Sequence, residues 1–301
     1  MNGLLYVDKP VGLTSHDVVA IVRRAARTKR VGHAGTLDPF ATGLLVLAVG
    51  MSTRLLPYVD GEPKVYDAVI RFGVETDTDD ATGGTTVARV APDFRDPVVR
   101  AMLSDAIVSL TGRIAQVPPA YSAKHINGER SHALARRGQG VALPPVEVTV
   151  HDWSQLEVVD DRLRVRITCA GGTYVRALAR DLGRAMGSAA HCLELRRERS
   201  GMADVVDAVP VTVLRPGAIA ESLVALRSPL DVLQGMSHEL LNEAALRDLA
   251  QGRTVPASVP GERAALLAVD PHTNARTVVG IGARTTNNRW QPKVVLLGEA
   301  S

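Results

Sequence analysis

The chain has 301 residues, of which 46% are hydrophobic, and its formal net charge is only +3. That length is enough for one large domain and a small one, and the apolar content can fill a sizeable core. No apolar run is long enough to span a membrane and no charged-then-apolar leader opens the sequence, so we expect a soluble, cytoplasmic protein.

The cysteines and histidines give no sign of a metal or redox site. Cys169 and Cys192 form no Cys-x-x-Cys pair, and we interpret both as small core residues. The eight histidines are scattered without a His-x-x-x-His pattern, and no paired-carboxylate cluster appears. We therefore expect no metal and no cofactor.

The first predicted elements are a strand, a turn and a helix. A short strand is expected at residues 3–8 and a turn at residues 9–12. Thr14 or Ser15 can cap the helix, because a hydroxyl oxygen accepts a hydrogen bond from an N–H group of the first turn. The apolar positions of the helix recur at helical spacing: Val18, Val19, Val22, Ala25 and Ala26. Its arginines then face outward and form a basic approach to the next segment.

Residues 32–45 combine one carboxylate, one histidine and three glycines with the start of an apolar run. Glycine permits a positive φ, and Pro39 biases Asp38 towards an extended backbone, so a rigid loop can present the Asp38 side chain. An ordinary turn is the plain alternative for an Asp-Pro pair among glycines. A phosphate-binding loop fits less well, because the Gly-Lys-Ser/Thr ending of a P-loop is missing.

The order of residues in this segment is specific. Its sequence Gly-His-Ala-Gly-Thr-Leu-Asp-Pro-Phe-Ala-Thr-Gly-Leu-Leu resembles the catalytic loop of the TruB family, the bacterial tRNA pseudouridine-55 synthases. The resemblance implies that Asp38 is the essential catalytic residue. It also implies that His33 fills the gap that a flipped nucleotide leaves in the RNA stack.

A strand is predicted from residue 64, where apolar and polar residues alternate up to an acidic turn. Tyr66 falls within the family's second motif, and the resemblance implies that its ring stacks on the target uracil. Asp77, Asp79 and Asp80 lack the spacing of an EF-hand calcium loop with its final Glu. We interpret these three carboxylates as a solvated turn.

A helix is expected from Asp96, its cap, through Pro97 in its first turn to near Gly112. The prolines and polar residues of 113–145 then indicate an exposed insertion. Its cations are Arg113, Lys124, Arg130, Arg136 and Arg137. Such a cluster is either a solvated surface or a track for a phosphate backbone. The segment is similar to the RNA-gripping thumb of the TruB family.

Further strands are predicted at residues 146–150, 156–159 and 163–169, which together imply a mixed sheet. A helix follows, with its apolar stripe at Leu178, Leu182 and Met186. Arg176, Arg180 and Arg184 lie four residues apart on this helix, and an exposed, ion-paired face is the plain interpretation.

The motif that opens this helix, Gly-Gly-Thr-Tyr-Val-Arg, carries a further resemblance. In the TruB family it supplies an active-site tyrosine and an arginine that pairs with the catalytic aspartate, which implies these roles for Tyr174 and Arg176. Leu195, within Cys-Leu-Glu-Leu-Arg-Arg, falls where the family has an apolar contact to the flipped base. Taken alone, Leu195 would be a core residue.

The last third changes in composition. From about residue 210 short helical pieces broken by proline and glycine indicate a linker, and a helix is expected from about residue 238. The Val-, Leu- and Ile-rich segments after it resemble the small PUA-type domain of these synthases, although a generic interaction module has the same pattern. We thus expect a catalytic domain at 1–236, with a thumb insertion at about 113–145, and a PUA-like domain at 237–301.

The resemblance implies an α+β fold with a mixed, mainly antiparallel sheet and the isomerisation of uridine 55 in tRNA. The catalytic residues would be Asp38, Tyr66 and Arg176, with His33, Tyr66, Tyr174 and Leu195 binding the substrate. The expected partner is tRNA, through its T-loop and acceptor-T arm, with no membrane, no obligatory protein partner and a monomeric state. Two other functions remain open, a non-catalytic RNA-binding protein and a phosphoryl-transfer enzyme that uses Asp38.

Overall fold

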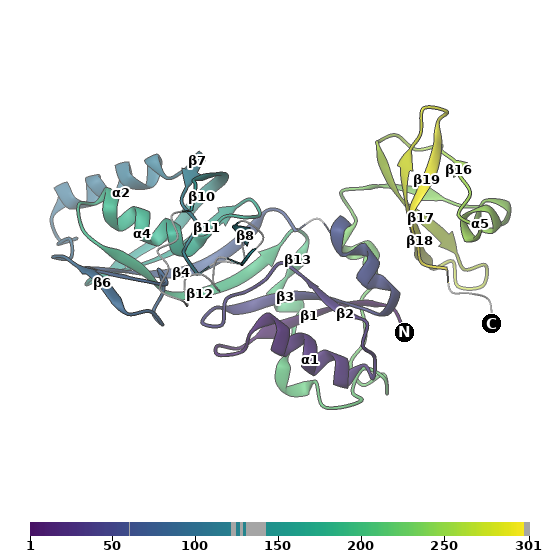
Figure 1. The fold of residues 1–301 in the computed structure, drawn as a ribbon, viewed down its shortest axis with the longest axis horizontal. Helices are drawn as coiled ribbons and strands as arrows, with labels where there is room; N and C mark the ends of the chain where they lie inside the picture. Colours follow the sequence, from purple (N-terminus) through teal and green to yellow (C-terminus); the bar gives the residue numbers. More distant parts are fainter. Residues whose placement is uncertain (60, 122–124, 127–128, 131–142, 298–301) are drawn as a thin grey trace.

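The structure is a computed structural model that describes residues 1–59, 61–121, 125–126, 129–130 and 143–297. Within these residues a ten-stranded sheet lies at one end of an elongated molecule and a five-stranded sheet at the other (Figure 1). This arrangement confirms the α+β class with a β-rich C-terminal part. None of the helices in the described ranges is both long and apolar enough to cross a membrane.

The large sheet has the strand order β14-β1-β3-β12-β4-β11-β10-β7. In that order the strands are Val209–Pro210, Gly3–Lys9, Thr42–Val49, Ala190–Ser200, Lys64–Phe72, Arg162–Cys169, Val146–Val159 and Gly112–Gln116. Two short strands lie off this path: β2 (Val31–Ala34) pairs with β3, and β13 (Ala203–Asp204) pairs with β12. The β14–β1 and β3–β12 pairs are parallel and the other pairs along the path antiparallel, which confirms a mixed, mainly antiparallel sheet.

Helices α1 (Ser15–Ala25), α2 (Pro97–Ser109) and α4 (Val175–Ala185) share one core with this sheet. Their buried residues, such as Val22 and Leu178, lie in one apolar cluster with strand residues such as Leu47 and Ile70. Each Å² of apolar surface removed from water contributes about 25 cal/mol, so this shared core holds the helices against the strands that carry the site.

The predicted N-caps of α1 and α2 are confirmed. Thr14 Oγ1 accepts a hydrogen bond from the N–H of Asp17, whose carboxylate accepts one from the N–H of Thr14. Asp96 caps α2 by accepting from the N–H of Val98, and Pro97 occupies the first turn. Both helices therefore begin where their capping side chains satisfy free N–H groups.

The five-stranded sheet has the order β15-β17-β18-β19-β16. Its strands are Ser237–Leu240, Arg263–Val269, Arg276–Arg284, Arg289–Val295 and Val255–Pro256, and helix α5 (Glu243–Ala250) packs on it. The helix expected from about residue 238 was placed too early. Residues 237–240 form a strand that pairs with β17, and α5 begins only after its cap, Asn242.

Two other expectations differ from the structure. A single strand, β10, replaces the two predicted at 146–150 and 156–159, because it continues through irregular pairing between Val150 and Glu157 and buries Trp153 on the way. The segment after residue 210 is more than a linker. The N–H groups of Gly217 and Ile219 donate to carbonyl groups of α1, and Ile219 lies in the core of the large sheet.

The opposite face of the large sheet contributes to a second core, which it shares with the five-stranded sheet. Leu4 and Leu44 belong to the same apolar cluster as Leu267 and Ile281. A 3-10 helix, η1 (Gly50–Tyr58), adds a polar contact, because Arg54 Nη1 donates to the carbonyl oxygen of Val295 at 2.6 Å. The two sheets are therefore joined by buried apolar surface.

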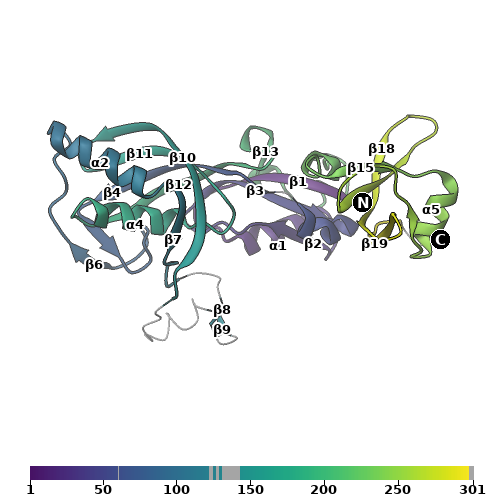
Figure 2. The same cartoon turned by 90° about the horizontal axis from the view of Figure 1, so that it is seen from above.

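Shorter elements connect these parts: β5 (Val74–Thr76), β6 (Thr85–Ala88), β8 (His125–Ile126), β9 (Glu129–Arg130), η2 (Val205–Asp207), η3 (Val211–Val213) and η4 (Pro229–Val232). Figure 2 shows β8 and β9 at some distance from the large sheet, on one side of it. Most of the insertion predicted at 113–145 lies outside the described residues, and so do Lys124, Arg136 and Arg137.

Candidate active site

The segment around Asp38 forms a loop between β2 and β3. The loop is closed by the N–H of Ala41, which donates to the carbonyl oxygen of Asp38 at 3.1 Å. Helix α1 holds the residue before Asp38: the N–H of Leu37 donates to Ser15 Oγ at 2.9 Å, and this hydroxyl donates to the Leu37 carbonyl at 3.2 Å. Asp38 thus follows a residue whose N–H and C=O are both bound to one side chain.

Lys9 anchors the other side of the loop from the end of β1. Its side chain is fully buried, and Nζ donates to the carbonyl oxygens of Pro10 at 3.0 Å, Leu13 at 2.8 Å and Pro39 at 3.4 Å. Burial lowers the pKa of Lys9 to about 8, while the charge of Asp38 acts in the opposite direction. Lys9 therefore ties the residue after Asp38 to the turn that precedes α1.

Arg197 of β12 anchors the start of the loop. Only 1% of this residue is exposed, and its guanidinium donates to the carbonyl oxygens of Gly35 at 3.1 Å, Thr36 at 3.4 Å and Leu44 at 2.8 Å. Strands β3 and β12 meet closely here, because a Cβ on Gly43 would lie 2.3 Å from the carbonyl oxygen of Arg197. Side chains from three separate elements therefore fix the backbone on both sides of Asp38.

Asp38 pairs with Arg176, as the family resemblance implies. Arg176 Nε lies 2.9 Å from Asp38 Oδ2, and Nη2 donates to Oδ1 at 3.1 Å. The guanidinium also donates to the carbonyl oxygens of Thr78 at 2.7 Å and Tyr121 at 3.1 Å, and only 4% of the Arg176 side chain is exposed. An ion pair with one hydrogen bond to the carboxylate and further bonds to backbone acceptors fixes the orientation of the guanidinium.

The acidic segment at 77–80 is not the solvated turn that its composition indicated. Asp77 is exposed, but Asp79 and Asp80 are only 6% and 5% exposed. Asp79 Oδ2 lies 2.8 Å from Arg180 Nη1, and Asp80 Oδ2 lies 3.5 Å from Arg176 Nη1. The two carboxylates are buried because helix α4 presents buried arginines to them, which also overturns the exposed face expected for Arg176 and Arg180.

The charge of Asp38 reflects opposing influences. Burial raises its pKa above the usual 3.8, the Arg176 guanidinium lowers it through charge and hydrogen bonding, and the negative charge of Asp80 raises it. The net pKa is raised, so Asp38 needs a higher pH to ionise than an exposed aspartate does. A carboxylate with a raised pKa is a stronger base once it is ionised.

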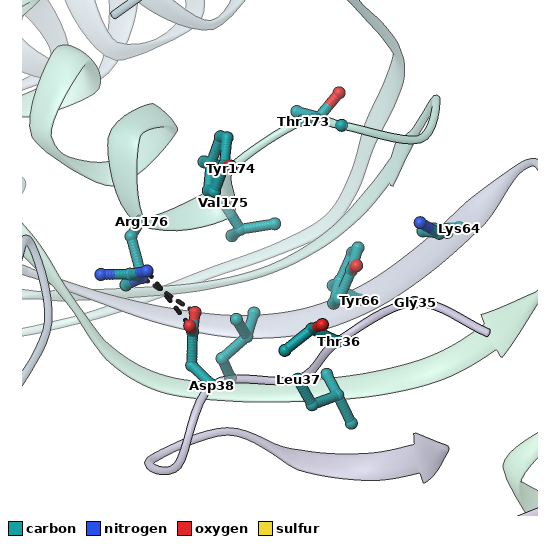
Figure 3. A pocket seen from close by; sticks show the side chains of 12 residues that line it. Gly35, Thr36, Leu37, Asp38, Lys64, Tyr66, Thr173, Tyr174, Val175 and Arg176 are labelled. Atoms are coloured by element: carbon teal, nitrogen blue, oxygen red, sulfur yellow. Dashed lines mark hydrogen bonds and ion pairs between the residues drawn. The ribbon is translucent and has the colours of Figure 1, made fainter. Parts of the chain in front are cut away.

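Asp38 and Arg176 line a cavity of about 250 Å³, together with Tyr66, Leu195 and Tyr174 (Figure 3). Cavities that take drug-sized ligands measure about 300–1,000 Å³, so this one suits a smaller group. Tyr66 comes from β4 and Leu195 from the neighbouring β12, and both are 7% exposed. Burial raises the pKa of the Tyr66 phenol, and the Arg197 guanidinium partly offsets this.

Tyr174 and His33 have different relations to the cavity. Tyr174 lines it and is the last residue before α4, where its N–H donates to Gln116 Oε1 at 2.9 Å. His33 is not among the lining residues: it lies in β2, where its ring meets the ring of His16 edge-on at 5.8 Å between centroids. Burial lowers the pKa of His33, and the charges of His16 and Arg197 lower it further.

Three residues that support the site were not recognised in the sequence. Lys9 and Ser15 give no signal of burial, because one lies in a turn motif and the other in a capping position. The position of Arg197 does signal burial, because it lies two residues after Leu195 and strand residues at that spacing share a face. An arginine on the inward face of a strand needs buried acceptors, and the loop carbonyls provide them.

The chain offers no evident metal centre in the part that the structure describes: no group of three or more His, Cys, Asp or Glu side chains there could hold a metal ion. Cys169 and Cys192 are free thiols and fully buried, as expected for core residues. Burial raises the pKa of Cys169 to about 11 and that of Cys192 still further, so both stay protonated at neutral pH.

The chain matches the family model described as TruB family pseudouridylate synthase, N-terminal domain, over residues 23–175. A relative in Leifsonia xyli subsp. xyli, named tRNA pseudouridine synthase B, is 44% identical over 259 residues, which cover 84% of this chain and 83% of that protein. The protein of the same name in Solibacter usitatus is 37% identical over 297 residues, which cover 98% of this chain and 100% of that protein.

Solved structures share the fold. An H/ACA RNP bound to a substrate RNA containing 2′-deoxyuridine aligns with a TM-score of 0.70 and 19% identity over 99% of this chain and 86% of that one. The archaeal box H/ACA sRNP Nop10-Cbf5 complex aligns with a TM-score of 0.70 and 21% identity over 99% and 87% of the two chains. At these identities the likeness supports the fold.

Proposed function

This chain belongs to the TruB family of pseudouridylate synthases and is therefore an isomerase, and on that premise we propose that it converts uridine 55 in the T-loop of tRNA into pseudouridine. The name shared by the two bacterial relatives, tRNA pseudouridine synthase B, supports tRNA as the substrate. The observation that carries the proposal is the Asp38–Arg176 ion pair, which lines one cavity with Tyr66 and Leu195.

The reaction breaks the bond between ribose C1′ and uracil N1 and joins C1′ to C5. C5 loses its proton and N1 gains one, so substrate and product are isomers. An ionised carboxylate beside the nucleoside can attack C1′, attack the uracil ring, or help to remove the C2′ proton. We assign this role to Asp38, because the fixed loop presents it and Arg176 favours its charged form against burial.

The remaining predicted site residues would hold the flipped nucleotide. Removing a base from its stack costs on the order of a few kcal/mol, and stacking on an aromatic ring returns roughly 1–3 kcal/mol. Tyr66 is proposed to supply that ring, with Leu195 and Tyr174 as further contacts in the same cavity. His33, which lies outside the cavity lining, is proposed to fill the vacated place in the RNA stack.

The rest of the chain would bind the folded RNA. We propose that residues 1–236 form the catalytic domain, that the insertion at 113–145 grips the T-arm, and that residues 237–301 are a PUA-like domain. The enzyme would act as a monomer without a protein partner, and a tRNA substrate implies that it works in the cytoplasm. Sedimentation of the protein with and without tRNA tests the stoichiometry, since a one-to-one complex is expected.

Tritium release from C5 of uridine in a T-loop RNA tests the proposed function. Under single-turnover conditions the wild type should release tritium, and Asp38→Asn should bind the RNA but release none. Asp105→Asn, which neutralises an exposed carboxylate of α2, is the matched control and should react like the wild type. Tight binding without release by the wild type would instead favour the non-catalytic RNA-binding function.

A further inference from the structure

Lys64 carries a charge that the proposed chemistry does not use. It begins β4 two residues before Tyr66, so both side chains lie on the same face of the strand, and both line the cavity. In the view of Figure 3, Lys64 lies beyond Tyr66 from the Asp38–Arg176 pair. The cavity is thus bordered by an ion pair in one part and by an ammonium group in another.

The Lys64 ammonium forms no close polar contact with the described residues. Within the part of the chain that the structure describes, Nζ makes neither a hydrogen bond nor an ion pair. The charge of Glu62 raises the pKa of Lys64, but no ion pair joins the two side chains, and Glu62 Oε1 accepts a hydrogen bond from the N–H of Gly171 at 2.7 Å. A partly buried cation that lines a cavity and forms no ion pair is a ready site for an anion.

Arg197 adds positive charge at the same place. A Cβ on Gly35 would lie 3.4 Å from Arg197 Nη1 and 3.6 Å from Lys64 Nζ, so both cations approach the same glycine. The carbonyl oxygens that accept from Arg197 bind its protons but do not neutralise its charge. Burial lowers the pKa of Lys64 and the charge of Arg197 lowers it further, so an anion bound there would relieve both effects.

We propose that Lys64 binds a backbone phosphate next to the target uridine. This inference rests on the proposed function, because it takes the base to lie on Tyr66 and the ribose beside Asp38. A flanking phosphate is then the anion closest to the free ammonium. A lysine suits this role as a compact charge with three donors.

The test measures the affinity of T-loop RNA hairpins that carry one neutral methylphosphonate linkage, either 5′ or 3′ of the target uridine. Lys64→Met should weaken binding of the all-phosphate RNA about ten- to hundredfold and reduce the slope of log K against log salt by about 0.7–0.9. One of the two neutral RNAs should bind the wild type as weakly as the all-phosphate RNA binds Lys64→Met. With that RNA, Lys64→Met should cause no further loss, because the two changes remove one contact.

Two control variants accompany this cycle. Lys293→Met removes an exposed charge from the five-stranded sheet, and its effect on affinity should be the same for the all-phosphate RNA and both neutral RNAs. Lys64→Arg should restore part of the affinity and the salt slope. The proposal would be overturned if Lys64→Met bound the all-phosphate RNA as tightly as the wild type does. It would also be overturned if Lys64→Met, unfolding at the wild-type temperature, lost further affinity with each of the two neutral RNAs, so that the two losses were additive. Tritium release is measured separately. If Lys64 and one phosphate were coupled in binding but the wild type released no tritium, the proposed function would be refuted and the phosphate contact would stand.

Discussion

Arg176 faces two carboxylates, and this makes Asp80 part of the electrostatics of Asp38. Asp80 is itself held in place, because its Oδ1 accepts hydrogen bonds from the hydroxyl groups of Thr78 at 2.7 Å and Thr82 at 2.6 Å. Burial raises the pKa of Asp38 most, Arg176 lowers it, and the charge of Asp80 raises it again. The guanidinium is therefore shared between a carboxylate in the cavity and one behind it.

Replacing Asp80 by Asn should move the acid limb of the reaction to lower pH. The substitution removes a negative charge that opposes the ionisation of Asp38, so the pKa of Asp38 falls. Activity is then retained at pH values where the wild type has lost it. The measurement is the pH dependence of the single-turnover rate of tritium release.

Asp77→Asn is the control for this shift, since Asp77 is exposed and its Oδ1 accepts only from the N–H of Gly84 among the described residues. Its acid limb should coincide with that of the wild type. If the limb of Asp80→Asn also stayed in place, the charge of Asp80 would have no influence on the carboxylate that reacts.

Among individual residues, the sequence motifs identified the members of the site, but they missed the residues that influence it through their charge. The pairing of Asp38 with Arg176 was predicted because two motifs carried it, whereas nothing in the acidic run at 77–80 distinguished a buried carboxylate from a solvated one. Burial of Asp80 depends on an arginine almost a hundred residues away, so it follows from tertiary packing alone. The catalytic roles of Asp38 and Arg176 stay predictions, and so do the roles of Tyr66, Tyr174, Leu195 and His33.

The β2–β3 loop depends on the close approach of β3 and β12. Gly43 has a φ of +98°, in a region that favours glycine, and any side chain there would meet the backbone of Arg197. Arg197 in turn donates to the carbonyl groups at the start of the loop. The geometry of the loop is thus coupled to the pairing of two strands.

Gly43→Ala should therefore destabilise the fold by more than the roughly 1–3 kcal/mol that a strained backbone alone costs. The matched control is Gly12→Ala, because Gly12 also has a positive φ, +89°, but a Cβ on it would meet nothing within 4 Å. Urea unfolding of the two variants separates strain from the clash. Equal losses in both would show that β3 and β12 can separate at little cost.

Elements were predictable where the pattern of residues was local. The helices α1 and α2 follow from their caps and apolar spacing, and the strand at 64–72 from its alternation. Strand β10 was divided in the prediction because its irregular pairing interrupts the alternation, and β15 was taken for a helix because it is too short for a periodic signal. Both depend on the neighbouring strand that pairs with them.

The two sheets share a buried apolar cluster, so we expect the chain to unfold as one unit. Within the five-stranded sheet, Glu239 is 5% exposed, and its carboxylate accepts from Ser258, Val259 and Trp290 Nε1. Burial alone would raise the pKa of Glu239, but these hydrogen bonds outweigh it and the net pKa is lowered. A lowered folded pKa stabilises the fold above the unfolded value, about 4.5, and this stability is lost as the pH falls through the folded pKa.

Glu239→Gln should consequently lower the free energy of unfolding of the whole chain by about 1–3 kcal/mol near neutral pH, and by less as the pH falls below about 4.5. Hydrogen exchange measured on amides of both sheets should show the same loss of protection in each. Glu243→Gln is the control, because that carboxylate is 92% exposed. Loss of protection confined to the five-stranded sheet would mean that the shared cluster does not couple the two parts.

The anchor that Arg197 provides has a consequence for the timing of synthesis. Arg197 leaves the ribosome 162 residues after Gly35, whose carbonyl group it binds. At about 5–20 residues per second this is a delay of roughly 8–32 s, during which the loop exists without the side chain that fixes its start. Arg176 also arrives late, 138 residues after Asp38. A nascent chain on a ribosome surrounded by tRNA therefore carries Asp38, the proposed catalytic carboxylate, in an unassembled site until most of the large sheet has been translated.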